Sequence, residues 1–371
     1  MNEFMRIGDI CNILNGYAFK SSKYVADGIR VIRITNVQKG FVEDTNPQYY
    51  PVSEQREIEK YMLCEGDLLM SLTGNVGRVG LLSAEMLPAA LNQRVACIRI
   101  RNPAVIYKPF LFHLLNSDYF ENKCILASQG VAQKNMSTEW LKEYPIPSFS
   151  MDKQMEIASI FDKIDDLIAR RKEQVRNMDQ AVKSRFIELF GDCDLTHPQE
   201  SWVTIKEIGS VVGGATPKTD HDEYWGGSYR WITPAELDAD SGYIYDSVRK
   251  LTKAGVESCS LQEMPVGTVI LSSRAPIGKV AIAGNTFYCN QGFKNIICKE
   301  GITPRYLYTV LLLNVEYLNS LGRGATFKEI SKGIVESIRI PVPSMELQEQ
   351  FAAFVEQTDK SKLCSKMEVA A

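Results

Sequence analysis

Hydrophobic positions are spaced in two ways along this chain, and the two spacings predict different elements. Short runs of β-branched and aliphatic residues, bounded by Gly, Pro or Asn, predict strands. They fall at 29–37, 67–72, 78–83, 94–100, 229–233, 267–273, 279–284 and 293–298. Two longer stretches that open with proline predict helices over 109–127 and 304–320, because proline is favoured in the first turn of a helix.

The clearest predicted element is one long amphipathic helix from about residue 152 to residue 190. Its apolar positions alternate in steps of four and three, and Arg171 and Arg185 occupy two further positions of the same stripe. This spacing is typical of a helix that packs along a partner helix. The predicted seam consists of Ile157, Phe161, Ile164, Ile168, Val175, Met178, Val182 and Leu189. Gly191 ends the helix, which is about 57 Å long at about 1.5 Å per residue.

The second half of the chain repeats the first half in the same order. Two stretches that start at Gly66 and Gly267 align without a gap and read GDLLMSLTGNVGRVGLL and GTVILSSRAPIGKVAIA. The Asn-Gln pairs at 92–93 and 290–291 also match, as do the segments that end in Pro-x-Pro, QGVAQKNMSTEWLKEYPIP and RGATFKEISKGIVESIRIPVP. The ordered matches extend over about 150 residues, so the chain is two copies of one unit.

The repeat predicts an α/β fold of two tandem, similar, mixed α/β domains, each followed by a helix. The domains are expected at 1–150 and 196–345, and the helices at 151–191 and 346–371. In the second helix, Phe351 and Val355 fall where Ile157 and Phe161 fall in the first. That second helix stops about 14 residues earlier than the first by the repeat alignment. Part of the first seam must therefore find a partner elsewhere or remain exposed.

Composition is typical of a globular protein without a membrane segment. Of the 371 residues, 45% are hydrophobic and 23% are charged, and the sequence shows neither a signal-peptide pattern nor an 18-residue apolar run. The nine cysteines form no C-x-x-C pair, which favours reduced, mostly buried thiols in a cytoplasmic protein. A net charge of −3, with both domains near neutral, neither requires nor excludes a nucleic-acid partner, since local potential decides binding to phosphate.

Signatures of catalysis and of metal binding are missing from the sequence. The stretch SSRAPIGKVAIA at 272–283 lacks the glycine and the Ser or Thr that a phosphate-binding loop requires. NPQYY at 46–50 differs from the Asn-Pro-Pro-aromatic motif of amino-methyltransferases at Gln48. No histidine has Cys or His at metal-ligand spacing, so no metal site is expected. These results favour a binding protein over an enzyme.

Polar and basic residues of the predicted turns are the candidates for binding DNA. Arg, Asn and Gln can read base edges, while Lys and Thr position phosphates. The first domain offers Lys20, Thr73, Arg78, Asn92, Gln93, Arg94 and Lys134. The second domain offers Thr216, Lys218, Arg274, Lys279, Gln291, Lys294, Arg323 and Lys328. Two other interpretations stay open: an Arg in a turn can be a solvated charge, and Asn-Gln after a bend can be a hydrogen-bonded corner that closes the sheet.

The ordered motifs make the chain recognisable. In the second half, GGATPKTDHDEYWGG, GTVILSSRAPIGKVAIA, CNQGFKNI and GRGATFKEISKGIVESIRIPVP closely resemble the target-recognition repeats of type I restriction–modification specificity subunits. In the first half, NGYAFKSSKY, GIRVIRITNV and GDLLMSLTGNVGRVG resemble another variant of the same repeat. The resemblance covers nearly the whole chain.

This resemblance implies a non-catalytic subunit that reads double-stranded DNA at a bipartite, gapped site. It implies that the two helices pair as an antiparallel coiled coil and dock two modification (methyltransferase) subunits, which restriction and translocase subunits can join. S-adenosylmethionine and ATP with Mg²⁺ are then expected in the partner subunits, and no cofactor in this chain. The alternative is a shortened or decoy specificity subunit that acts as an interaction scaffold without full target recognition.

Overall fold

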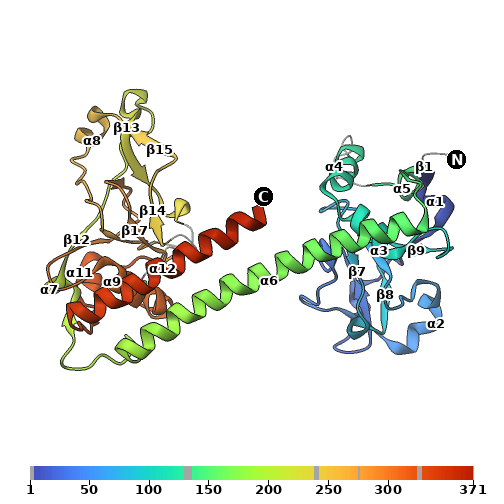
Figure 1. Ribbon diagram of the computed structural model, residues 1–371, viewed down its shortest axis with the longest axis horizontal. Coiled ribbons are helices and arrows are strands. Elements are labelled where there is room, and N and C mark those ends of the chain that lie inside the picture. Colours follow the sequence, from blue (N-terminus) through green and yellow to red (C-terminus); the bar gives the residue numbers. More distant parts are fainter. Residues whose placement is uncertain (1–3, 129–135, 238–241, 275, 324–327, 371) are drawn as a thin grey trace. The chain divides into compact units, whose positions relative to one another are not determined.

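The computed structural model describes residues 4–128, 136–237, 242–274, 276–323 and 328–370, with the side chains of 366–370 left out. The chain forms two compact units, Met1–Ala169 and Arg170–Ala371. The helix α6 (Met151–Phe190) belongs to both, because its first part packs on the first unit and its last part on the second (Figure 1). The long helix expected over about 152–190 is thereby confirmed.

The first unit combines a five-stranded sheet, in the order β2-β9-β6-β7-β4, with a three-stranded sheet, β5-β3-β8. All neighbouring pairs are antiparallel except β4–β7 and β3–β8, which are parallel. Its strands are β1 (Phe4–Arg6), β2 (Cys11–Asn15), β3 (Ile29–Ile32), β4 (Gly40–Phe41), β5 (Tyr49–Tyr50), β6 (Leu68–Ser71), β7 (Val79–Leu81), β8 (Ala89–Leu91), β9 (Val95–Ile100) and β10 (Pro145–Pro147). Its helices are α1 (Ile7–Ile10), α2 (Gln55–Ile58), α3 (Lys108–Leu115), α4 (Asp118–Ala127) and α5 (Thr138–Glu143).

The second unit repeats this topology with sheets β12-β19-β16-β17-β14 and β15-β13-β18, in which β14–β17 and β13–β18 are the parallel pairs. Its strands are β11 (Val203–Thr204), β12 (Gly209–Val212), β13 (Trp225–Ile232), β14 (Tyr243–Ile244), β15 (Arg249–Leu251), β16 (Val269–Leu271), β17 (Val280–Ala283), β18 (Tyr288–Cys289), β19 (Asn295–Cys298) and β20 (Arg339–Ile340). Its helices are α7 (Ile205–Ile208), α8 (Lys253–Ser258), α9 (Pro304–Leu313), α10 (Val315–Ser320), α11 (Lys332–Ser337) and α12 (Met345–Ala370). The repeat read from the sequence is therefore a repeat of structure.

Apolar side chains alternate between the two faces of each central strand, and each five-stranded sheet is therefore covered on both faces. In β6, Leu68 and Met70 pack against α1, α3 and α4, whereas Leu69 faces the core shared with the three-stranded sheet. In β16, Val269 and Leu271 pack against α9, and Ile270 faces the smaller sheet. Successive side chains of a strand point to opposite faces, so each unit has a helix-side core and a sheet-side core.

Each of the eight predicted strands overlaps an observed strand, although β13 begins at Trp225, before the predicted start at 229. The two predicted helices were wrong because each is interrupted. The stretch 109–127 is two helices, α3 and α4, and 304–320 is likewise α9 and α10. Ser117 interrupts the first because its hydroxyl accepts a hydrogen bond from the Phe120 amide and so starts a new helix. Asn314 leaves the helical conformation with φ −116° and ψ 29° and ends α9.

A buried glutamine seats each long helix on its domain in the same way. The Gln154 amide donates to the carbonyls of Val105 and Phe149, at 3.0 and 2.9 Å, and its oxygen accepts from the Tyr107 amide at 2.8 Å. Gln348 donates to Gly301 and Pro343, at 3.0 and 2.9 Å, and accepts from the Thr303 amide at 2.7 Å. Both side chains are fully buried. These matching contacts set the direction in which each helix leaves its domain.

The helix α12 packs antiparallel to the last part of α6, as predicted. The Phe351 ring lies 5.4 Å from the Phe186 ring and 5.6 Å from the Phe190 ring. Farther along α12, the Lys362 ammonium pairs with the Asp179 carboxylate. Later residues of α12 therefore contact earlier residues of α6, so the two helices run antiparallel.

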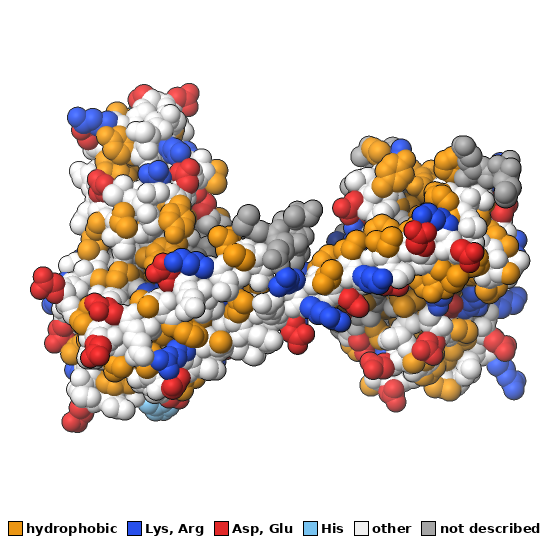
Figure 2. Space-filling view, in the orientation of Figure 1, with side chains coloured by type: hydrophobic (Ala, Val, Ile, Leu, Met, Phe, Trp, Pro, Cys, Tyr) orange, Lys and Arg blue, Asp and Glu red, His pale blue; other side chains and the backbone are white. Residues whose placement is uncertain are grey.

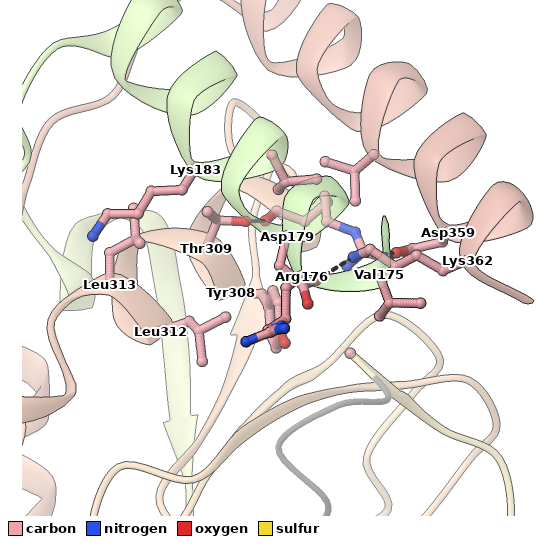
Figure 3. Close-up of a pocket in the computed structure, with 14 residues that line it drawn as sticks. Val175, Arg176, Asp179, Lys183, Tyr308, Thr309, Leu312, Leu313, Asp359 and Lys362 are labelled. Carbon is pink, nitrogen blue, oxygen red and sulfur yellow. Dashed lines mark hydrogen bonds and ion pairs between the residues drawn. The ribbon is translucent and has the colours of Figure 1, made fainter. Parts of the chain in front are cut away.

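Charged side chains line a pocket of about 400 Å³ between α6, α9 and α12. Figure 3 shows Asp359 and Lys362 of α12 near Asp179 of α6. Lys362 contacts both carboxylates, and Arg305 of α9 pairs with Asp359 at 3.3 Å. The Arg305 guanidinium also lies 4.7 Å from the Tyr243 ring centroid. These contacts hold α12 in one register against α6.

The predicted seam is packed in the second unit and partly exposed in the first. Val182 and Leu189 pack with Phe351 and Val355 in the second core, where Phe186, one position after Arg185, is fully buried. In the first unit Ile157 packs against the core, but Phe161 and Ile164 are 46% and 43% exposed. Ile168, Val175 and Met178 are half-buried. Figure 2 shows hydrophobic side chains gathered along the part of α6 that runs over the first unit.

Candidate nucleic-acid interface

The described parts of the turns after β16 and β6 share a hydrogen bond of 3.1 Å, from the Gly278 amide to Ser272 and from the Gly77 amide to Ser71, and in each the following cation is directed toward its own domain. Gly278 and Gly77 have φ of +87° and +89°, a conformation that favours glycine. The Lys279 ammonium donates to the carbonyls of Pro234 and Leu237, at 3.2 and 3.0 Å. Arg78 donates to the Gln38 side chain at 2.8 Å. Both cations therefore hold a neighbouring loop of their own unit.

The two Asn-Gln pairs divide their roles in the same way in both units. Asn92 accepts a hydrogen bond from the Arg94 amide at 3.1 Å, and Asn290 accepts from the Gly292 amide at 2.9 Å. The asparagines thus form the hydrogen-bonded corner that the sequence left as one of two interpretations. Gln93 and Gln291 come next and are exposed.

Three segments of the second unit bring predicted cations together around one carboxylate. Glu329 accepts from the Arg274 guanidinium at 3.0 Å and from the Lys294 ammonium at 3.1 Å. The backbone joins the same segments, since Ser273 donates to Gly292 at 2.8 Å and the Ile330 amide donates to Ser273 at 2.9 Å. Burial disfavours the charge on Glu329, but the hydrogen bonds from Lys294 and Arg274 outweigh that effect and lower the pKa of the carboxyl. We name Arg274, Lys294 and Glu329 the charged triad.

Other predicted residues of the second unit lie on the segments beside the charged triad. The Thr216 hydroxyl donates to the exposed Gln291 side chain at 2.6 Å. Arg323 is exposed and exchanges backbone hydrogen bonds of 3.0 and 3.1 Å with Glu329, and Lys328 precedes Glu329 and is exposed. Lys218 is exposed as well. Arg323, Lys328 and Gln291 thus lie on the segments that carry the charged triad, whereas the Lys218 carbonyl accepts a hydrogen bond from the Trp225 indole at 3.2 Å and belongs to another part of the unit.

Two tryptophans of the second unit form a separate cluster in the smaller sheet. Trp231 is buried, and its ring packs edge-to-face on Trp225 at 5.1 Å. The Arg249 guanidinium lies over the Trp225 ring, 3.4 Å from its centroid, and so covers one face of this ring. These contacts make the pair part of the fold.

The first unit presents a different set of side chains on the same scaffold. Lys20, Gln93 and Arg94 are exposed. The Thr73 hydroxyl is buried and has no hydrogen-bond partner among the described residues. Lys134, also predicted, lies outside the described residues.

Matched backbone hydrogen bonds define how the two surfaces correspond. Leu72 donates to Arg94 as Ser273 donates to Gly292, which places Arg94 where the second unit has glycine. By the same alignment Thr73 stands at the position of Arg274, and Ala96 at the position of Lys294. Sequence reasoning did not identify Glu329 as the partner of Arg274 and Lys294. Its position directly after the candidate Lys328 was the one feature of the sequence that could have pointed to it. The two units therefore differ in charge at equivalent positions.

The described residues show no group of three His, Cys, Asp or Glu placed to hold a metal ion. Among the helices of the described ranges, none is both long and apolar enough to cross a membrane.

Known proteins resemble both halves of the chain. The family model for the type I restriction modification DNA specificity domain matches residues 2–177 and again residues 200–367. The type I restriction enzyme MjaIX specificity subunit of Methanocaldococcus jannaschii is 43% identical over 184 residues, which are 48% of this chain and 42% of that protein. The putative MjaX specificity subunit of the same organism is 26% identical over 380 residues, covering 96% of this chain and 86% of that protein.

Solved structures agree on the fold. The type I S subunit from M. genitalium has a TM-score of 0.52 at 14% identity and covers 99% of this chain and 91% of its own. A chain from a study of assembly of the type I R-M system has a TM-score of 0.57 at 18% identity, with 99% and 93% covered. With two matches of one family model on two units of the same topology, the chain belongs to the family of type I restriction–modification specificity subunits.

Proposed function

We propose that this chain reads a bipartite DNA site, one half with each unit, for a type I restriction–modification complex. The observation that carries the proposal is the pair of equivalent loop surfaces, one built around the charged triad and the other around the exposed Gln93 and Arg94. A shared scaffold with different side chains at matched positions is what two different half-sites require.

The chemistry of these surfaces suits DNA. Arg and Gln can form paired hydrogen bonds with guanine and adenine edges, and Lys and Thr can position phosphates. The exposed Gln291 and Arg274 suit base edges, whereas Arg323 and Lys328 suit phosphates. Lys279 and Arg78 act indirectly, because they hold loops of their own unit.

The helices suit a role in spacing and assembly. Two recognition modules joined by one continuous helix read half-sites whose separation depends on the helix, as in dimeric DNA-binding proteins. We place two modification subunits on the helical regions, with restriction subunits joining them. S-adenosylmethionine, ATP and Mg²⁺ belong to those partners in this proposal.

Mapping of methylated adenines in cells that express this chain with its modification partner tests the proposal. The expected result is a two-part motif with a fixed gap. Arg274→Ala should relax only one half of the motif, and Arg94→Ala only the other, while exposed Lys253→Ala serves as a matched control. Absence of any methylated gapped motif would contradict DNA reading and favour the scaffold alternative. Methyl transfer by the purified chain alone would contradict a non-catalytic role.

A further inference from the structure

The contact between Arg274 and Glu329 occupies only one nitrogen of the arginine. The Arg274 Nε donates to the Glu329 carboxylate at 3.0 Å, and neither terminal nitrogen of the guanidinium has a partner among the residues that the structure describes. The Arg274 side chain is 46% exposed. The two terminal nitrogens are therefore left as paired donors, side by side in one plane, that a ligand can reach.

Glu329 is held in place from its other side. Its second oxygen accepts from the Lys294 ammonium at 3.1 Å, and this ammonium also lies 3.4 Å from the Ser273 hydroxyl. Burial alone would raise the pKa of the Glu329 carboxyl, but the hydrogen bonds from Lys294 and Arg274 lower it, so the carboxylate stays ionised. Both of its oxygens are thus engaged by cations of its own unit.

The backbone beneath the charged triad is fixed as well. Arg274 and Glu329 lie opposite each other in an antiparallel bridge, and Ser272 and Phe293 form a second bridge beside it. The Arg274 side chain is therefore anchored at its base by the backbone and near its tip by Glu329. A side chain that is already held in place loses less conformational entropy when it binds a ligand.

The balance of charge in the charged triad favours a base edge over a phosphate. A phosphate is attracted by net positive charge, and the Glu329 carboxylate opposes that attraction. A guanine edge carries no net charge, and its O6 and N7 acceptors are recognised by the geometry of paired donors. Arg323 and Lys328 are exposed and form no ion pair with a described residue, so these two cations suit phosphates better.

The first unit has no equivalent of this arrangement. Thr73 stands at the position of Arg274, and Ala96 stands at the position of Lys294. Neither side chain can present a pair of donors to a guanine. Recognition through an anchored arginine therefore belongs to the second unit alone.

We propose that Arg274 reads a guanine in the half-site of the second unit, and that Glu329 is the positioning residue that holds the guanidinium for this contact. The guanine O6 and N7 each accept a hydrogen bond from one terminal nitrogen of Arg274. This inference rests on the proposed function, in which each unit reads one half-site. It adds the base that is read and the residue that orients its reader.

DNA duplexes that differ by one acceptor atom test the inference. The full chain with its modification partner is titrated, by fluorescence anisotropy, with the mapped motif and with copies in which one guanine of the relevant half-site is replaced by 7-deazaguanine. This analogue lacks N7 and keeps Watson–Crick pairing. At one guanine the replacement should weaken binding by about fivefold, the equivalent of one hydrogen bond. With Arg274→Ala the same replacement should change the Kd by less than about twofold, because the donors are gone.

Glu329→Ala separates positioning from support of the fold. It keeps Arg274 but should reduce the preference for guanine over 7-deazaguanine by about threefold, while binding to unrelated DNA becomes tighter. Glu329→Gln keeps an oxygen that can accept from Arg274 and should retain more of this preference. Arg323→Ala is the matched control, and it should weaken binding to both duplexes equally, as loss of a phosphate contact does.

The outcomes distinguish this inference from the proposed function. A gapped motif whose Arg274-dependent half contains no guanine would overturn the inference and leave the proposed function standing. Equal binding of the guanine and 7-deazaguanine duplexes at every guanine of that half would have the same meaning. An unchanged preference in Glu329→Ala would refute the positioning role of Glu329. If no gapped motif is methylated, the proposed function fails, and the inference fails with it.

Discussion

Replacing Gln348 with methionine should destabilise the second unit and leave the first unit unchanged. Methionine is close to glutamine in length and volume, so the substitution removes hydrogen bonds without opening a large cavity. Gln348 is fully buried and joins the start of α12 to the backbone at Gly301, Thr303 and Pro343.

The expected loss follows from these three hydrogen bonds. A net contribution of about 1 kcal/mol for each gives a decrease of about 3 kcal/mol in the free energy of unfolding. The loss stays near this figure, although three backbone groups lose their partner, because Gly301 is exposed and Thr303 and Pro343 are half-buried, so water can reach part of the backbone. The exposed Gln350 on the same helix provides the control, and Gln350→Met should change stability by less than about 0.5 kcal/mol.

Tryptophan fluorescence can report on one unit at a time. Trp140 is the one tryptophan of the first unit, and Trp202, Trp225 and Trp231 belong to the second. In a Trp140→Phe background, urea unfolding followed by fluorescence therefore measures the second unit. A loss below about 1 kcal/mol for Gln348→Met would refute the reasoning. Equal destabilisation of both units, seen by hydrogen exchange, would refute the idea that each glutamine serves its own domain.

Three further outcomes are expected. Arg274→Ala should weaken DNA binding about tenfold without changing stability, whereas Lys279→Ala should lower the free energy of unfolding by about 1 to 2 kcal/mol, since it loses two hydrogen bonds; urea unfolding and gel-shift titration separate the two effects. Glu329→Gln should strengthen non-specific DNA binding about threefold at low salt, because it removes a repulsion of about 0.7 kcal/mol between the carboxylate and a phosphate about 6 Å away in water. It should also steepen the slope of log K against log salt concentration by about one, which fluorescence anisotropy across salt concentrations measures. Hydrogen bonds from the Thr196 hydroxyl and then from His197 lower the pKa of Asp194 to about 2. At pH values above the ordinary pKa of an aspartate, the charged Asp194 carboxylate therefore stabilises the turn, and this stabilisation is lost as the pH falls through about 2. An NMR titration of Asp194 should show a midpoint at about pH 2, and Thr196→Val should move that midpoint upward.

The repeat and the long helix could be predicted from the sequence because both are properties of spacing. The eight predicted strands carry enough β-branched and aliphatic residues to be found one by one. The breaks at Asn116 and Asn314 could not be found in this way, because the apolar pattern continues through them. What ends each helix there is a side chain that bonds to the local backbone, and this depends on geometry that a pattern does not contain.

The candidate site could be predicted only in part, for a similar reason. Residue type placed Arg274, Lys294 and Lys279 among the cations of the turns, and the structure separates them by what each one contacts. Lys279 reaches two backbone carbonyls, while Arg274 and Lys294 share Glu329. These partners lie 35 to 55 residues away along the chain, so no local pattern could identify them.

The corner at Asn290 and Gln291 has a consequence for how new specificities arise. Asn290 carries the hydrogen bond that holds the bend, and Gln291, one residue later, points outward. The same division holds at Asn92 and Gln93. In the proposed function, folding and reading thus belong to neighbouring residues, and the outward position can change without cost to the hydrogen bond that holds the bend. A library that varies only residues 93 and 291 should therefore yield folded proteins at high frequency, with altered target preference among them.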